Sequence, residues 1–191
     1  MSFYQPLVTA MVTFLLTCLL LSNKAAHKLQ DMPNERSLHL MPVPRIGGIG
    51  LITGVLCGWA LMSNSLVWWV VVPLIVLFTL SLLDDLYNLP VKLRLSVHLI
   101  AASLMVWGMD LFAQQGVAIA LAILLFTAWM INLYNFMDGS DGLAGGMALF
   151  GFGMYGIAAL LAKNTPLSLL NFCITAAAAS FELQKPLAGA S

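Results

Sequence analysis

Apolar stretches alternate with short polar segments along the whole chain. The apolar stretches cover residues 4–22, 46–62, 66–83, 95–113, 117–136, 147–162 and 166–181. A membrane-spanning helix needs about 20 apolar residues, with about 17 as the lower limit. In lipid no water is available to the backbone, so a helix that closes its own hydrogen bonds is favoured. The pattern therefore predicts an all-α polytopic membrane protein with about seven transmembrane helices.

The composition supports a membrane protein. Of the 191 residues, 61% are hydrophobic and 8% are charged, with a mean hydropathy of +0.94, whereas soluble domains carry about 25% charged residues. The net charge of zero means that the chain lacks the excess of positive charge typical of nucleic-acid-binding proteins. The three cysteines lie inside apolar runs and give neither a disulfide framework nor a metal-ligand spacing. No linker or repeat divides the sequence, so residues 1–191 are expected to form one transmembrane domain.

The basic residues predict the orientation in the membrane. If the N-terminus lies outside, the cytoplasmic segments begin at Asn23, Asp84 and Met137, and only Lys163 among the basic residues lies outside. The basic residues inside or near the cytoplasmic face are then Lys24, Lys28, Arg36, Arg45, Lys92, Arg94 and Lys185. The positive-inside rule favours this arrangement over its inverse.

Acidic residues collect on the same side, with Asp110 as the main exception. They are Asp31, Glu35, Asp84, Asp85, Asp138 and Asp141. The positive-inside rule counts Lys and Arg only, so it does not explain this cluster. Carboxylates, amides and bases on one membrane face indicate an active site in the cytoplasmic loops.

The first polar segment, Asp31–Gly48, is a stiff, basic path with three prolines and a glycine pair. Arginine donates bidentate hydrogen bonds to phosphate, and paired glycines let backbone N–H groups approach an anion closely. The candidate phosphate-binding residues of this segment are Arg36, His39, Arg45, Gly47 and Gly48. The alternative is a rigid basic linker that lies on anionic lipid headgroups.

The second polar segment opens with Asp84 and Asp85 at the end of the third apolar run. Adjacent carboxylates repel each other unless a nearby cation neutralises them. The cation could be a Mg²⁺ ion that bridges phosphates, or the side chain of Lys92 or Arg94. The alternative is a solvated helix end with a surface ion pair. His98 follows Arg94 by one helical turn and would lie on the same helix face. Its side chain either packs against neighbouring helices or contacts a lipid phosphate, and packing is the favoured interpretation.

The third polar segment is the most specific. Asn132, Asn135 and Asp138 recur every three residues and would share one face of a helix. Two Asp-Gly steps, at Asp138 and Asp141, then predict a turn. Such a stripe can hold a metal and a sugar nucleotide. The spacing of these residues does not match the ligand positions of an EF-hand calcium loop. A polar helix end without a function is disfavoured, because amides and acids near lipid are energetically costly.

The segments Asp31–Gly48, Asp84–Arg94 and Asn132–Gly146 together resemble the polyprenyl-phosphate N-acetylhexosamine-1-phosphate transferases of glycosyltransferase family 4. The resemblance covers about residues 1–180, and the first segment is most similar to the O-antigen and common-antigen branch. It implies a multi-pass enzyme of the bacterial inner membrane. In the implied reaction, polyprenyl (undecaprenyl) phosphate attacks the β-phosphate of a UDP-N-acetylhexosamine and releases UMP. The product would start a lipid-linked surface polysaccharide of the cell envelope, such as lipopolysaccharide O-antigen.

The resemblance also implies roles for residues. Asp84 or Asp85 would deprotonate or orient the lipid phosphate, and Asn135, Asp138 and Asp141 would line the nucleotide and metal site. Asp138 and Asp141 are the expected ligands of Mg²⁺, for which Mn²⁺ could substitute. The implied partners are polyprenyl phosphate, a UDP-N-acetylhexosamine, the membrane and a second copy in a homodimer.

The sequence departs from the family after Ala179. The family implies further helices, a Met-Gly-Asp segment and a histidine-bearing loop, whereas residues 180–191 form an atypical tail. We expect a reading frame truncated or shifted near residue 180, and hence an incomplete enzyme that is inactive alone. The competing interpretations are a non-catalytic membrane subunit and a transporter, whose ionisable residues would lie near the middle of the membrane.

Overall fold

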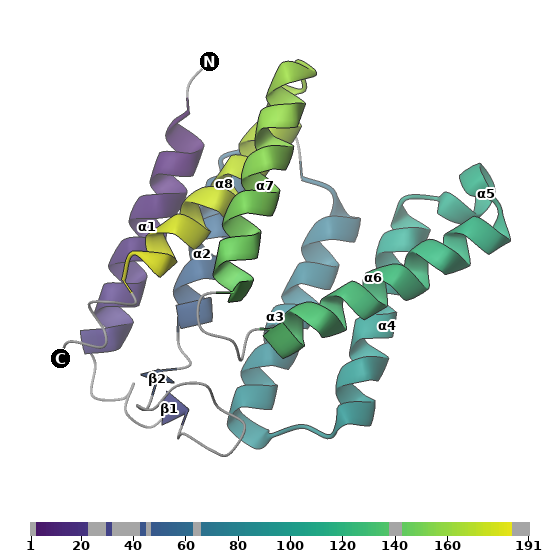
Figure 1. The fold of residues 1–191 in the computed structure, drawn as a ribbon, viewed down its shortest axis with the longest axis horizontal. Coiled ribbons are helices and arrows are strands. Elements are labelled where there is room, and N and C mark those ends of the chain that lie inside the picture. The colour runs from purple at the N-terminus through teal and green to yellow at the C-terminus, as the bar shows by residue number, and fades with distance from the viewer. Residues whose placement is uncertain are drawn as a thin grey trace. The chain divides into compact units, whose positions relative to one another are not determined.

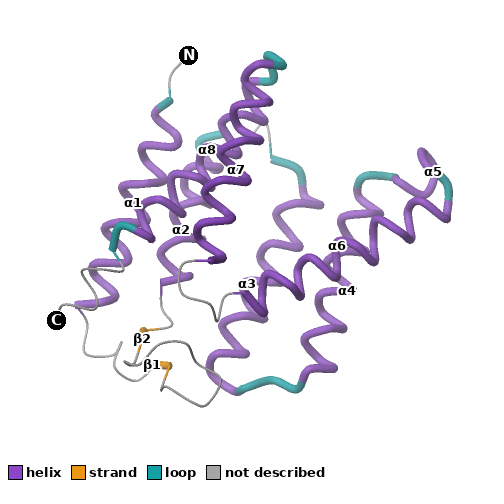
Figure 2. Tube along the Cα trace, in the orientation of Figure 1, coloured by secondary structure: helices purple, strands orange, loops and turns teal. Residues whose placement is uncertain are grey.

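The computed structural model describes residues 3–22, 30–31, 43–44, 47–62, 66–137 and 143–184. Helices dominate this part of the chain (Figures 1 and 2). Two strands of two residues each, β1 (Gln30–Asp31) and β2 (Val43–Pro44), pair antiparallel. The chain divides into two compact units, Met1–Ser65 with Asp138–Ser191, and Leu66–Met137. The predicted all-α architecture is confirmed.

Each predicted apolar stretch corresponds to a helix in the described part of the chain. The helices are α1 (Tyr4–Ser22), α2 (Gly47–Ala60), α3 (Trp68–Tyr87), α4 (Val91–Gly108), α5 (Leu111–Gln115), α6 (Val117–Met137), α7 (Leu143–Leu161) and α8 (Thr165–Glu182). Among the residues described, five helices are long and apolar enough to cross a membrane, namely α1, α3, α4, α6 and α7. The chain is a multi-pass membrane protein.

Some predicted boundaries are wrong at the helix ends. The stretch predicted at 95–113 is α4 followed by the separate α5, because Asp110 between them takes a left-handed backbone with φ of 54°. Helix α4 begins directly after Pro90, whose extended backbone precedes the first turn. Lys92 and Arg94, which the sequence placed in a loop, therefore lie in the first turns of α4.

The glycine pairs are helical as well. Gly47 and Gly48 open α2, and Gly145 and Gly146 lie in the first turn of α7. No atom lies within 4 Å of a Cβ added at Gly48. The space around Gly48 is therefore open, and its predicted approach to a phosphate stays a prediction.

Helices α1 and α2 of the first unit approach each other along a line of threonines and glycines. Thr9, Thr13 and Thr17 of α1 are at most 1% exposed. A Cβ added at Gly54 would collide with the Thr13 hydroxyl and lie 2.9 Å from the Thr9 carbonyl oxygen. Gly50 meets Thr17 and Gly58 meets Thr9 in the same way. In lipid the approach of backbones through small residues is what drives helices together.

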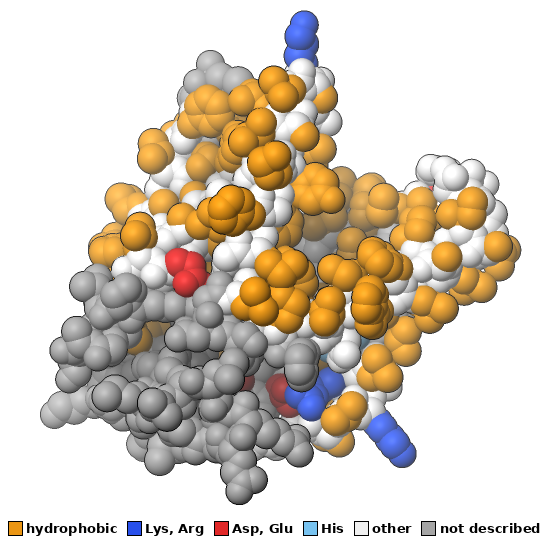
Figure 3. Space-filling view, in the orientation of Figure 1, with side chains coloured by type: hydrophobic (Ala, Val, Ile, Leu, Met, Phe, Trp, Pro, Cys, Tyr) orange, Lys and Arg blue, Asp and Glu red, His pale blue; other side chains and the backbone are white. Residues whose placement is uncertain are grey.

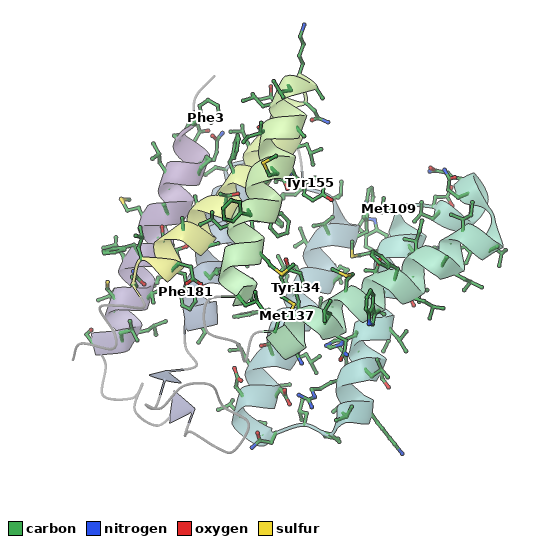
Figure 4. All side chains as sticks on the ribbon, in the orientation of Figure 1. Phe3, Met109, Tyr134, Met137, Tyr155 and Phe181 are labelled. Atoms are coloured by element: carbon green, nitrogen blue, oxygen red, sulfur yellow. The ribbon has the colours of Figure 1, made fainter. Side chains whose placement is uncertain are left out.

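Helix α8 joins the other helices of this unit through side chains that donate to backbone carbonyls. Trp59 Nε1 of α2 donates to the Leu170 carbonyl of α8 at 3.1 Å. Ser168 Oγ donates to the Gly156 carbonyl of α7 at 2.9 Å. Figure 1 shows α8 beside both α1 and α7. At the start of α1, Phe3 (Figure 4) packs edge-on against a ring of α8, with 6.2 Å between the ring centroids.

In the second unit α4 packs against both α3 and α6. Its Ala101 and Ala102 are fully buried and Val106 is 2% exposed. Gly108 of α4 lies against the Trp69 side chain of α3, where a Cβ would collide with the indole. Large apolar side chains point outward from these helices, and Figure 3 shows them along the visible helix faces, with charged side chains near helix ends. This surface fits a lipid environment.

Replacing Gly54 with alanine should separate α1 from α2. The added methyl group meets both a hydroxyl and the backbone of α1, so we expect a loss of about 1–3 kcal/mol despite the better helix propensity of alanine. Thermal unfolding in detergent measures the loss as a lower Tm. Gly151→Ala in α7 is the matched control, because nothing lies within 4 Å of its Cβ. Equal Tm values for the two variants would contradict the proposed close approach.

Candidate functional site

The short turn between α3 and α4 is built on Asp84. The Asn88 N–H donates to the Asp84 carbonyl at 2.8 Å, and Asn88 has a left-handed backbone with φ of 48°. The Leu89 N–H donates to Asp84 Oδ1, also at 2.8 Å. Asparagine tolerates this conformation better than most residues. Asp84 thus holds the end of α3 with its backbone and the turn with its side chain.

The second oxygen of Asp84 binds Arg94. Arg94 Nη1 donates to Asp84 Oδ2 at 2.9 Å, with 31% of the arginine side chain and 20% of the aspartate side chain exposed. A charge-assisted hydrogen bond at this degree of burial is stronger than an ordinary surface ion pair. It links the last turn of α3 to the first turns of α4.

A pocket of about 120 Å³ lies next to this ion pair, within the unit formed by residues 66–137. Its polar lining residues are Ser81, Asp84, Arg94, His98 and Asn135. Its apolar lining residues are Leu77, Leu80 and Ile131. The α6 part of the lining lies in the last turns of that helix, where Tyr134 and Met137 are labelled in Figure 4. Side chains from α3, α4 and α6 therefore meet at one end of this unit.

His98 is the most buried polar residue of the pocket. It is 3% exposed, so most of its surface is buried within the unit. Its Nδ1 atom is buried and has no hydrogen-bond partner within the described part of the chain. Neither His98 nor Ser81 was among the predicted site residues. The position of His98 one turn after Arg94 was the signal in the sequence that could have included it.

The structure brings together three of the predicted site residues, Asp84, Arg94 and Asn135. Asp85 is half-buried, and Lys92 and Asn132 are exposed; these three do not line the pocket. Gly47 and Gly48 lie in α2, in the other unit. The remaining predicted site residues lie outside the described residues, namely Arg36, His39, Arg45, Asp138 and Asp141.

The described residues do not by themselves assemble a metal centre. No group of three or more His, Cys, Asp or Glu side chains placed to hold a metal occurs among them. The two predicted metal ligands, Asp138 and Asp141, directly follow α6 and are not described. The carboxylate and amide oxygens of Asp84 and Asn135 are nevertheless the kind of donor that Mg²⁺ prefers.

A family model and several curated proteins are similar to this chain, and their names indicate the same type of transferase. The model of "Glycosyl transferase family 4" matches residues 67–183, which is more than half of the chain. No solved structure matches the chain.

Similar curated proteins carry related names. An "Undecaprenyl-phosphate alpha-N-acetylglucosaminyl 1-phosphate transferase" of Yersinia pestis is 31% identical over 84% of this chain and 48% of its own length. A protein of the same name from Thermotoga maritima is 30% identical over 77% of this chain and 49% of its own. A "Probable undecaprenyl-phosphate N-acetylglucosaminyl 1-phosphate transferase" of Bacillus subtilis is 26% identical over 92% and 54%. The chain spans about half the length of these relatives.

The ion pair of Asp84 with Arg94 should be visible in a double-mutant cycle. Asp84→Asn keeps an acceptor for the Leu89 N–H but loses the charge, and Arg94→Gln loses the cation. We expect a coupling free energy of about 1 kcal/mol from thermal unfolding of the two single variants and the double variant in detergent. Additive effects of the two substitutions would show that the pair contributes nothing to stability.

Proposed function

This chain belongs to glycosyl transferase family 4, and from that membership we propose that it transfers N-acetylhexosamine 1-phosphate from a UDP-sugar to polyprenyl phosphate. The reaction takes place at the cytoplasmic face of the bacterial inner membrane and releases UMP. The names of the relatives support the polyprenyl phosphate acceptor and the phosphosugar that is transferred. N-acetylglucosamine is the sugar that those names suggest for the donor.

The observation that carries this proposal is the pocket at the ends of α3 and α6 and the start of α4. It places a carboxylate, a guanidinium, an imidazole and an amide next to apolar side chains. Phosphoryl transfer needs positioning and charge neutralisation more than covalent chemistry by the protein. A polar site at helix ends lets a water-soluble donor meet an acceptor that stays in the membrane.

Of the two adjacent aspartates, we assign the contact with the lipid phosphate to Asp84. Asp84 lines the pocket, whereas Asp85 does not. Two donors orient the Asp84 carboxylate, and each of its oxygens keeps a lone pair that can accept a proton from the acceptor phosphate. Arg94, held by Asp84, supplies positive charge next to the phosphate oxygens.

Magnesium belongs to this proposal as the cofactor. Asp138 and Asp141, three and six residues beyond Asn135 in the sequence, would hold Mg²⁺ together with the donor's phosphates. When bound, the ion would neutralise the diphosphate and its leaving group. Mn²⁺ has similar oxygen-ligand chemistry and would substitute.

Because the chain spans about half the length of its relatives, the transfer reaction is tested with membranes that contain the chain extended to the relatives' length, together with polyprenyl phosphate and uridine-labelled UDP-N-acetylglucosamine. We expect UMP release that depends on the lipid, and at least a hundredfold less in Asp84→Asn, because the acceptor then loses the group that receives its proton. Asp110→Asn is the matched control, since Asp110 lies beyond the other end of α4. UMP release at the same low level from wild type and Asp84→Asn would overturn the proposal.

Removal of divalent cations should stop the same reaction. With excess EDTA we expect no UMP release above the level without enzyme, and added Mg²⁺ or Mn²⁺ should restore it, because the diphosphate charge is then neutralised again. Asp138→Asn should raise the Mg²⁺ concentration needed for half-maximal rate. Transfer that continues unchanged in EDTA would remove magnesium from the proposal.

A further inference from the structure

The proposed reaction gives no role to His98, although this residue is more than nine-tenths buried and lines the pocket. Its Nδ1 is buried without a partner among the described residues. Leaving a buried polar atom without a hydrogen bond costs about 1–3 kcal/mol. The position of His98 in the lining of the pocket, beside Asp84 and Arg94, leaves its other ring nitrogen, Nε2, as the atom that could contact a ligand.

Only one of the two nitrogens of the neutral His98 ring can donate a hydrogen bond. A neutral imidazole carries one N–H donor and one acceptor nitrogen. Buried donors without a partner are rarer in proteins than buried acceptors without one. The buried Nδ1 is therefore assigned as the acceptor, and the proton as belonging to Nε2. In this tautomer the one N–H of the His98 ring is the Nε2–H, and His98 is a lining residue of the pocket.

The lining of the pocket is more polar toward the ends of α3 and α6. Asp84 and Asn135 lie in the last turns of α3 and α6, whereas Leu80 and Ile131 lie one turn earlier in the same helices. His98 is one turn into α4 from Arg94 and belongs to the boundary between these zones. A ligand with a phosphate at one end and a hydrocarbon chain at the other matches this order.

The pocket is small. Its volume of about 120 Å³ lies below the roughly 300–1,000 Å³ of pockets that hold whole small molecules. This size matches a phosphate group and the first atoms of its chain.

We propose that His98 is a further substrate-contacting residue, whose Nε2–H donates to a non-bridging oxygen of the acceptor's phosphate monoester beside Arg94. This inference rests on the proposed function and names the residue that distinguishes a phosphate-bearing acceptor from the free alcohol. A phosphate monoester has its second pKa near 6, so a fraction keeps one proton at pH 7. That P–OH can donate to Asp84, while the remaining oxygens accept from Arg94 and His98.

The test measures binding rather than turnover, so that it does not depend on transfer activity. The full chain in detergent is titrated calorimetrically with farnesyl phosphate, with farnesol and with inorganic phosphate. For His98→Leu we expect the Kd for farnesyl phosphate to rise about tenfold to a hundredfold, the usual effect of losing one hydrogen bond to a charged group. His98→Gln keeps an N–H donor and should stay within about threefold of wild type. Farnesol binding should be the same in all three proteins.

Two controls separate this contact from a loss of folding. Ser103→Ala changes an exposed residue of the same helix that bonds only to its own helix, and it should bind as wild type does. Nitrogen NMR of the wild-type chain with labelled histidine rings gives a second readout. One ring N–H signal, absent from His98→Gln, should shift with farnesyl phosphate and stay unchanged with farnesol.

Each outcome bears on a different part of the argument. Equal affinity of wild type and His98→Leu for farnesyl phosphate, with no shifted ring signal, would overturn the role of His98 and leave the proposed function standing. A wild-type chain that binds farnesol as tightly as farnesyl phosphate would remove the phosphate acceptor from both proposals. Inorganic phosphate that binds as tightly as farnesyl phosphate would overturn the lipid as the source of the phosphate.

Discussion

Backbone hydrogen bonding without water is the constraint on which this structure depends. In the hydrocarbon core each peptide group must find its partner inside the protein, so the chain is helical wherever it is apolar. Among the described residues, the non-helical backbone precedes, follows or lies between helices. The three non-glycine residues with positive φ among those described, Asn88, Asp110 and Lys163, all lie between consecutive helices. Polar chemistry in such a protein is therefore found at these ends, or where side chains satisfy one another.

Asp84 connects this constraint to the proposed chemistry. Its backbone carbonyl and Oδ1 accept the N–H groups of Asn88 and Leu89, the first two residues after α3, and its Oδ2 accepts from Arg94. The same carboxylate therefore closes a turn and orients a cation. A site built in this way needs no long loop, because the turn between α3 and α4 is only three residues long. The geometry of the helix ends is then also the geometry of the pocket.

The other unit meets the constraint by close packing. Lipid chains are as apolar as leucine, so burying leucine gives little association between helices in a membrane. Threonines of α1 against glycines of α2 bring two backbones together. Trp59, Ser168 and Gln184 donate to carbonyls of neighbouring helices. These contacts supply the association that the hydrophobic effect supplies in water.

The sequence by itself determined the fold class, the approximate helices and three of the residues that meet in the pocket. It could do so because hydropathy is a local property, and because Asp84, Arg94 and Asn135 are costly near lipid unless they have a function. Only the tertiary structure decided that Arg94 turns toward Asp84 while Lys92 is exposed, and that His98 of α4 shares a pocket with Asn135 of α6. The rotation of each helix and its neighbours set these contacts. The meeting of His98 with Asn135 depends on two helices that are separate in the chain, and even the local pair of Arg94 with Asp84 depends on the turn that joins α3 to α4.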